Sequence, residues 1–198
     1  MDPRLIANLK QQYVLLRPTV EFETDNDGYL GDGSFSITFA ARDGRVPCVV
    51  KFSKRPWAAD PGVAKERQAL LDLMLQCNGH PHVANLHYFD DDVLGHLATQ
   101  WERGEISLEQ RLKACLANGE RGIPRDELRT YMEQAARGLD FVNGRGIVHR
   151  DVKPENLLLF QGQVKLIDFG FARLSEISSA TNSVLGTPIF APAEANDG

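Results

Sequence analysis

Residues 149–156 constrain this chain more than any other feature of its sequence. They place a carboxylate at Asp151, a cation at Lys153 and a side-chain amide at Asn156, and a second carboxylate, Asp168, follows 17 residues after Asp151. Phosphoryl transfer needs a carboxylate beside the attacking hydroxyl, cations on the phosphates and oxygen ligands for Mg²⁺. We therefore expect Asp151 to act as the base, Lys153 to contact the transferred phosphoryl group, and Asn156 and Asp168 to bind Mg²⁺. The alternative is a polar loop between a helix and a strand, with no chemical role.

Length and composition limit what can surround such a site. The chain has 198 residues, 42% of them hydrophobic, which is enough to bury one core or the cores of two lobes. Its 22 basic and 27 acidic residues give a net charge of −5, which argues against broad binding to nucleic acid or anionic membranes. No long apolar window is present, so neither a membrane span nor a signal peptide is expected. The spacing of the three cysteines fits neither a metal site nor a disulfide framework, so we expect a cytoplasmic or nuclear protein.

Local patterns predict a β-rich first half with one main helix, followed by a helical second half. Short strands are expected at 37–42, 46–52, 83–89, 97–101, 157–160 and 164–167, and helices at 3–16, 60–76, 107–117 and 124–143. Asp43 and Gly44 predict a hairpin turn, and the acidic residues 90–92 are expected to form another turn. Gly104 separates the two compositions, so we expect an α+β fold with two lobes that join there. The helix at 3–16 either packs on the domain or binds a partner.

Two features of the first half add groups that bind phosphates. The segment 31–36 contains Gly31 and Gly33, which let backbone N–H groups approach phosphates closely, although a plain hairpin turn would have the same composition. Lys51 lies within the apolar residues 48–52, and a lysine in a buried strand requires an anionic partner. Glu66, on the helix that follows, and phosphate oxygens would provide that partner. The alternative is a lysine on the solvent face of an edge strand.

Together these motifs resemble those of the eukaryotic-type protein kinase family over residues 29–194. The similar segments are residues 30–35 (glycine-rich loop), Lys51 and Glu66 (strand lysine and helix partner), 149–151 (catalytic loop) and 168–170 (metal-binding motif). Lys153 and residues 186–188 are similar to the pattern of serine/threonine kinases. The resemblance implies an enzyme that uses ATP and Mg²⁺ to phosphorylate serine or threonine in protein substrates. It also implies a bilobal fold with a β-rich N-lobe and a mainly α-helical C-lobe.

The resemblance implies further roles around the nucleotide. Backbone groups of Gln100, Trp101 and Glu102 would hold the adenine ring in the hinge between the lobes. Glu105, at the end of the same segment, would also line the site. Leu158 would lie beneath the adenine ring.

Other implied roles concern the substrate and its control. Glu105 and Glu155 match positions where basic-directed kinases bind substrate arginines. His149 is expected to be packed rather than catalytic. Ser183 stands where the family's principal activating phosphorylation site falls, and its phosphate would bind Arg150.

The chain also departs from the family pattern. Ser36 replaces the third loop glycine, and Val49 replaces the alanine that usually faces adenine. The expected organisation is an extension at 1–24, then an N-lobe at 25–98, a hinge at 99–105 and an incomplete C-lobe at 106–198. The missing C-lobe helices are expected to leave apolar residues of the helix around 128–139 exposed. The alternative function is a non-catalytic nucleotide- or partner-binding module, or an inactive fragment of a longer kinase. The oligomeric state is not predicted.

Overall fold

The computed structural model describes residues 1–56 and 61–174, and the chain divides into two compact units. Among the described residues, the first unit contains residues 1–56, 61–71 and 85–103, and the second contains residues 72–84 and 104–174. The chain therefore passes between the units three times. Side chains are described throughout these ranges except at residues 61–66, 171, 173 and 174.

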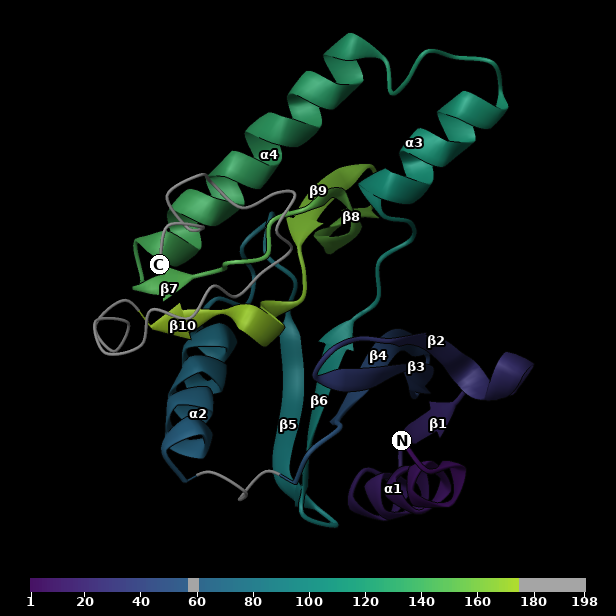
Figure 1. Ribbon diagram of the computed structural model, residues 1–198, viewed down its shortest axis with the longest axis vertical. Coiled ribbons are helices and arrows are strands. Elements are labelled where there is room, and N and C mark those ends of the chain that lie inside the picture. Colours follow the sequence, from purple (N-terminus) through teal and green to yellow (C-terminus); the bar gives the residue numbers. More distant parts are fainter. Residues whose placement is uncertain (57–60, 175–198) are drawn as a thin grey trace. The chain divides into compact units, whose positions relative to one another are not determined.

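A six-stranded sheet forms the framework of the first unit (Figure 1). Its strands are β1 (Val20–Phe22), β2 (Tyr29–Asp32), β3 (Ser36–Asp43), β4 (Val46–Ser53), β5 (Leu86–Val93) and β6 (His96–Glu102). They pair antiparallel in the order β1-β3-β4-β6-β5, and β2 pairs with another part of β3. The hairpin predicted at Asp43 and Gly44 is confirmed, because β3 ends at Asp43 and Gly44 has the positive φ of 59° that such a turn requires.

The turn between β5 and β6 differs from the prediction. The acidic residues 90–92 do not form it, because β5 continues through them to Val93. The turn lies instead at Leu94 and Gly95, whose φ angles are 53° and 78°. The Asp92 carboxylate accepts a hydrogen bond from the Gly95 N–H at 3.1 Å, so the acidic run stabilises the turn from within the strand.

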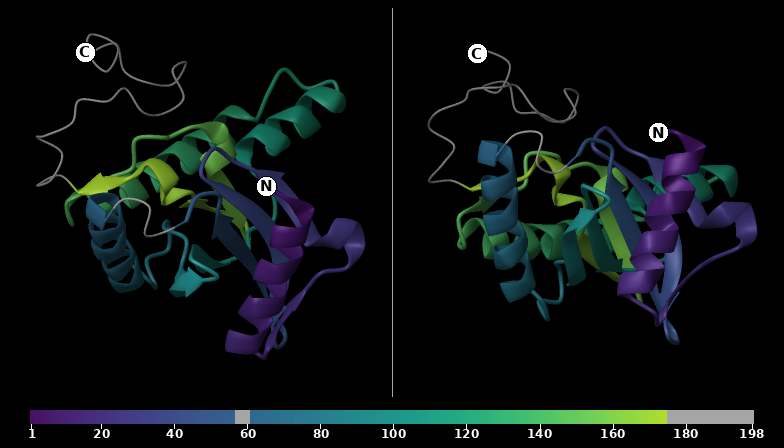
Figure 2. Two further views of the ribbon diagram at one scale, coloured as in Figure 1. Left: turned by 60° about the horizontal axis from the view of Figure 1, so that its bottom comes forward. Right: turned by 90° about the horizontal axis from the view of Figure 1, so that it is seen from below.

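The helix α1 (Pro3–Leu16) covers one face of this sheet (Figure 2). The Asp2 side chain caps its first turn by accepting a hydrogen bond from the Arg4 N–H at 2.8 Å. Leu9 and Tyr13 are fully buried in one cluster with strand residues such as Phe39 and Phe52. Of the two alternatives for this segment, packing on the domain is therefore the one observed. Burial of a leucine side chain contributes about 2 kcal/mol, so α1 is part of this unit's core.

The helix α2 (Pro61–Gln76) confirms the helix predicted at 60–76. Its apolar residues Leu70, Leu71 and Met74 are buried. This burial accounts for the apolar spacing in the sequence.

The second unit contains the helices α3 (Leu108–Ala117) and α4 (Arg125–Asn143), both predicted. Ser107 and Gln110 form a capping box that starts α3. The two helices are joined by Arg111, whose guanidinium donates two hydrogen bonds to the Glu127 carboxylate at 2.8 and 3.0 Å.

Two short antiparallel strand pairs complete the second unit. β8 (Leu157–Phe160) pairs with β9 (Gln163–Leu166), and β7 (Ile147–Val148) pairs with β10 (Arg173–Leu174). β9 lies beside α4 (Figure 1), where the Val164 N–H donates to the Gln134 side-chain oxygen at 2.8 Å. None of the described helices is long and apolar enough to cross a membrane.

The apolar face of α4 is only partly covered. Tyr131, Ala135 and Val142 are buried. Leu128 and Met132, in contrast, are 39% and 43% exposed. The expectation of uncovered apolar side chains on this helix is therefore confirmed for these two residues.

Candidate active site

The candidate base, Asp151, lies in the loop between β7 and β8 and is 3% exposed. Its carboxylate accepts hydrogen bonds from Lys153 Nζ at 2.9 Å and from Asn156 Nδ2 at 2.8 Å. A buried carboxylate without such partners would be strongly unfavourable. The structure thus brings together three of the predicted site residues and gives the carboxylate one orientation.

Asn156 ends the short 3₁₀ helix Pro154–Asn156 and is 5% exposed. Besides the carboxylate, its Nδ2 group also donates to the Asp151 main-chain oxygen at 2.8 Å. Both hydrogen bonds use the amide nitrogen. This orientation leaves the amide oxygen as the atom that can serve as a metal ligand.

His149 links the loop to the strand that precedes Asp168. Its Nε2–H donates to the Ile167 main-chain oxygen at 2.9 Å, and its Nδ1 accepts the Asp151 N–H at 3.3 Å. The ring is 2% exposed and packs against Phe169, with 4.7 Å between ring centroids. Burial lowers the pKa of His149, which favours the neutral ring that these two hydrogen bonds require. The packed role expected for His149 is confirmed, and the hydrogen bond to the Asp151 backbone was not foreseen.

Asp168 is held close to the same loop through its neighbour. The Ile167 N–H donates to the Asn156 main-chain oxygen at 3.0 Å, so the two predicted metal ligands lie on segments that are bonded to each other. Asp168 itself has a left-handed backbone with φ of 62°, and its Oδ1 accepts the Gly170 N–H at 3.3 Å. Such a conformation costs a non-glycine residue about 1–3 kcal/mol and is concentrated at functional sites.

The donor set of the second unit fits Mg²⁺. This ion prefers one or two protein carboxylates or other hard oxygen ligands and fills its remaining positions with water and substrate phosphates. Asp168 and Asn156 supply two oxygen ligands. Within residues 1–56 and 61–174, no group of three or more His, Cys, Asp or Glu side chains could form an all-protein metal site. An ion held by these two residues would complete its coordination with water and phosphate oxygens.

The predicted phosphate-binding residues of the first unit share one face of the sheet. Thr38 in β3 pairs directly with Gly31 in β2 and with Lys51 in β4, and directly paired residues point to the same side. Gly33 then begins the turn to β3, with its N–H donating to the Ser36 oxygen at 2.9 Å. A Cβ atom added at Gly31 would meet nothing within 4 Å, so the sheet leaves open space beside it.

The predicted hinge residues lie at the end of β6. The side chain of Gln100 is buried on the α1 face of the sheet, where Tyr13 donates to its Oε1 at 2.9 Å and its Nε2 donates to Asp43 at 3.0 Å. Neighbouring Trp101 alternates to the other face, opposite Val49 of β4. Tyr13 and Asp43 thus support this strand, although no local signal in the sequence connects them with it.

Glu102 is already paired within the first unit. Its N–H donates to the Asn85 main-chain oxygen at 3.0 Å, and its carboxylate accepts the Asn85 N–H at 2.7 Å. An adenine ring could use the Glu102 N–H only after this bond opens. Gln100 and Trp101 are likewise paired, because β6 lies between β4 and β5 and both residues have partners in each of these strands.

The remaining predicted residues lie in the second unit or outside the described side chains. Leu158 in β8 packs close to Gly104, where a Cβ atom would lie 2.8 Å from the Leu158 side chain. Glu105 is exposed, and its carboxylate accepts the Gln161 N–H at 2.9 Å. The Glu66 side chain, Ser183 and the segment 186–188 lie outside what the structure describes.

The sequence of this chain is similar to those of known proteins. The family model of the protein kinase domain matches residues 24–196. The chain is 34% identical over 188 positions to serine/threonine-protein kinase B of Synechocystis sp., covering 84% of this chain and 32% of that protein. It is 31% identical over 175 positions to serine/threonine-protein kinase chk1 of Schizosaccharomyces pombe, covering 83% of this chain and 34% of that protein. The chain thus spans about a third of the length of these relatives. On the family match and these identities, the chain belongs to the protein kinase family.

Proposed function

We propose that this chain carries the catalytic groups of an ATP-dependent serine/threonine protein kinase. The observation that carries the proposal is the buried Asp151 carboxylate, held by Lys153 and Asn156. The names of the relatives support serine or threonine as the acceptor. The reaction would transfer the γ-phosphoryl group of ATP to the side-chain hydroxyl of a protein substrate.

Each residue of the site has a defined part in this reaction. Asp151 accepts a hydrogen bond from the substrate hydroxyl, directs its oxygen at the γ-phosphorus and takes up its proton. A bond forms from this oxygen to the γ-phosphorus, and the bond from the γ-phosphorus to the bridging oxygen of ADP breaks. Lys153 neutralises charge on the phosphoryl group, and Lys51 does the same for the other phosphates. Asn156 and Asp168 would hold Mg²⁺, which neutralises phosphate charge when bound.

Protein substrates with basic residues near the acceptor fit this proposal. Glu105 and Glu155 are both exposed carboxylates, and Glu105 uses one oxygen for the Gln161 N–H. Arginine side chains pair well with such carboxylates. A peptide library phosphorylated by the enzyme should show arginine or lysine before the acceptor, and a profile without this enrichment would remove this part of the proposal.

The test is phosphate transfer by the purified chain of 198 residues. With labelled ATP, Mg²⁺ and a generic basic protein substrate, we expect transfer that Asp151→Asn lowers by about 10²- to 10⁴-fold, the usual range for a proton-transfer group. ATP binding by the variant should remain within about twofold, because Asp151 contacts the acceptor and not the nucleotide. Equal transfer by both proteins would show that the activity does not arise at this site.

A second candidate is a kinase-like module that binds nucleotide without turnover. The exposure of Leu128 and Met132 favours it, because an uncovered apolar face on α4 is a surface where another protein could pack. ATP binding without transfer in the same assay would support this candidate.

A further inference from the structure

The glycine-rich segment of the first unit contains an acidic residue. Asp32 stands between Gly31 and Gly33, in the segment proposed to approach the phosphates of ATP. A carboxylate at this place would repel a polyphosphate anion unless its charge were neutralised. The structure pairs it with a cation, because Lys54 Nζ forms an ion pair with Asp32 Oδ1.

The sheet register places this ion pair on the side away from Lys51. Ile37 pairs directly with both Asp32 and Phe52, so these three residues point to one face. Lys51 is adjacent to Phe52 in β4 and therefore points to the opposite face. Lys54 lies just beyond the end of β4 at Ser53, and its ion pair with Asp32 places its amine on the Asp32 side. The register thus turns the Asp32 side chain away from the proposed phosphate side, and the ion pair with Lys54 holds the carboxylate there.

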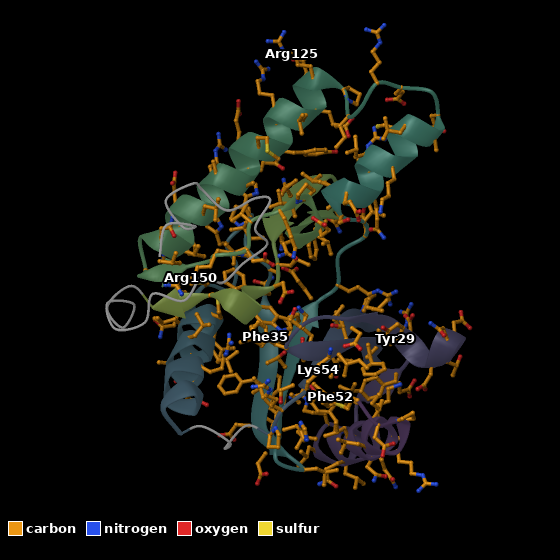
Figure 3. The ribbon with its side chains drawn as sticks, viewed as in Figure 1. Tyr29, Phe35, Phe52, Lys54, Arg125 and Arg150 are labelled. Carbon is orange, nitrogen blue, oxygen red and sulfur yellow. The ribbon has the colours of Figure 1, made fainter. Side chains whose placement is uncertain are left out.

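Lys54 also holds the turn through its backbone. Its N–H donates to the Phe35 main-chain oxygen at 2.8 Å, at the tip of the turn between β2 and β3. Figure 3 shows the two residues close together. One residue therefore binds the segment at two points, once through its side chain at Asp32 and once through its main chain at Phe35.

The exposure of the pair indicates what it can contribute. The side chains of Lys54 and Asp32 are 28% and 42% exposed. An ion pair at such a surface stabilises a fold very little, because water and salt screen it. The Lys54 cation still cancels the charge of Asp32 close to the turn, and a ligand with several negative charges is sensitive to the local net charge.

We propose that Lys54 is a positioning residue for nucleotide phosphates, which neutralises Asp32 and holds its carboxylate away from the phosphate side of the glycine-rich turn. The proposal rests on the proposed function, since it concerns the same nucleotide site. It predicts that removal of the Lys54 charge and removal of the Asp32 charge have opposite effects on the affinity for ATP. Loss of Lys54 leaves a free carboxylate in the turn, whereas loss of the Asp32 charge leaves an additional cation.

The test measures the equilibrium binding of ATP, ADP and adenosine to the purified chain. We expect Lys54→Gln to weaken ATP by about three- to tenfold, ADP by less, and adenosine by under about twofold, because the repulsion grows with phosphate charge. Asp32→Asn should bind ATP as well as the wild type or more tightly. The double variant should return to within about twofold of the wild type, and about 0.5 M salt should reduce every difference.

Two controls separate this role from a structural one. Lys54→Arg should keep wild-type binding. Lys113→Gln, which breaks another exposed ion pair, that with Glu109 on α3, should change no affinity. The proposal is overturned if Lys54→Gln and Asp32→Asn weaken all three ligands alike, or if neither changes ATP binding. In those cases the wild type still binds ATP, so the proposed function stands. A wild type that binds no nucleotide would overturn both.

Discussion

Gly138 offers a sharp test of the packing of α4 against His82 and β9. A Cβ atom at this position would lie 2.5 Å from the His82 main-chain oxygen and 3.1 Å from the Leu166 side chain. The His82 oxygen also accepts the Leu166 N–H at 3.0 Å. Replacement of Gly138 by alanine must therefore displace either the helix or the backbone at His82, close to the strand that leads into Asp168.

The expected magnitude follows from two opposing effects. Alanine is about 1 kcal/mol more favourable than glycine inside a helix, which stabilises the variant. Overpacking costs about 1–3 kcal/mol, and loss of the hydrogen bond between His82 and Leu166 costs about 1 kcal/mol more. Gly138→Ala should therefore lower the free energy of unfolding by about 1–3 kcal/mol, or the melting temperature by about 3–9 °C for a chain of this length.

The assay is thermal and urea denaturation followed by circular dichroism. Ala136→Gly is the matched control, because residue 136 is exposed on the same helix and its substitution reports helix propensity alone, at about 1 kcal/mol. Without a steric clash, Gly138→Ala should raise the free energy of unfolding by about the amount by which Ala136→Gly lowers it. A Gly138→Ala variant that is more stable than the wild type by this amount would refute the close approach between α4 and His82.

Two further predictions concern buried polar groups. Tyr13→Phe should destabilise the first unit by about 1–2 kcal/mol in urea denaturation, because the Gln100 side-chain oxygen loses its donor in the core. Tyr88→Phe is the control. It should cost less stability, because the Tyr88 hydroxyl that donates to Asp90 is only partly buried. Burial lowers the pKa of His149, so the unfolded chain binds a proton more readily than the folded chain. The stability contributed by neutral His149 should be complete above about pH 6.5 and decrease as the pH falls below that value, and His149→Gln should flatten this dependence in urea midpoints measured from pH 7 to pH 5. An unchanged slope in that variant would assign the pH dependence to other groups.

Much of the candidate site was accessible to sequence reasoning because its groups are close together along the chain. Asp151, Lys153 and Asn156 lie within six residues, so a short loop is sufficient to join them. The same holds for the capping box of α3 and for the hairpin at Gly44, where local geometry and the residue type determine the turn.

The incorrect turn at residues 90–92 shows the limit of local signals. Aspartate favours turns on average, but here the edge strand tolerates an acidic run and the positive φ values fall on Leu94 and Gly95. The choice between the two positions depends on the pairing of β5 with β6. That pairing is a property of the sheet and not of the turn residues.

The sequence by itself determined the order of the proposed base, cation and metal ligands, together with the helices and the hairpin at Gly44. Only the tertiary structure decided how those parts are supported. Tyr13 and Gln100 bond across 87 residues of sequence, and His149 reaches the backbone of Ile167, which precedes Asp168. Such contacts form where packed elements bring distant residues together, and each must offset the entropy of closing a long loop. No periodicity or spacing in the sequence predicts these long-range contacts, because the packing of the whole unit determines which distant residues meet.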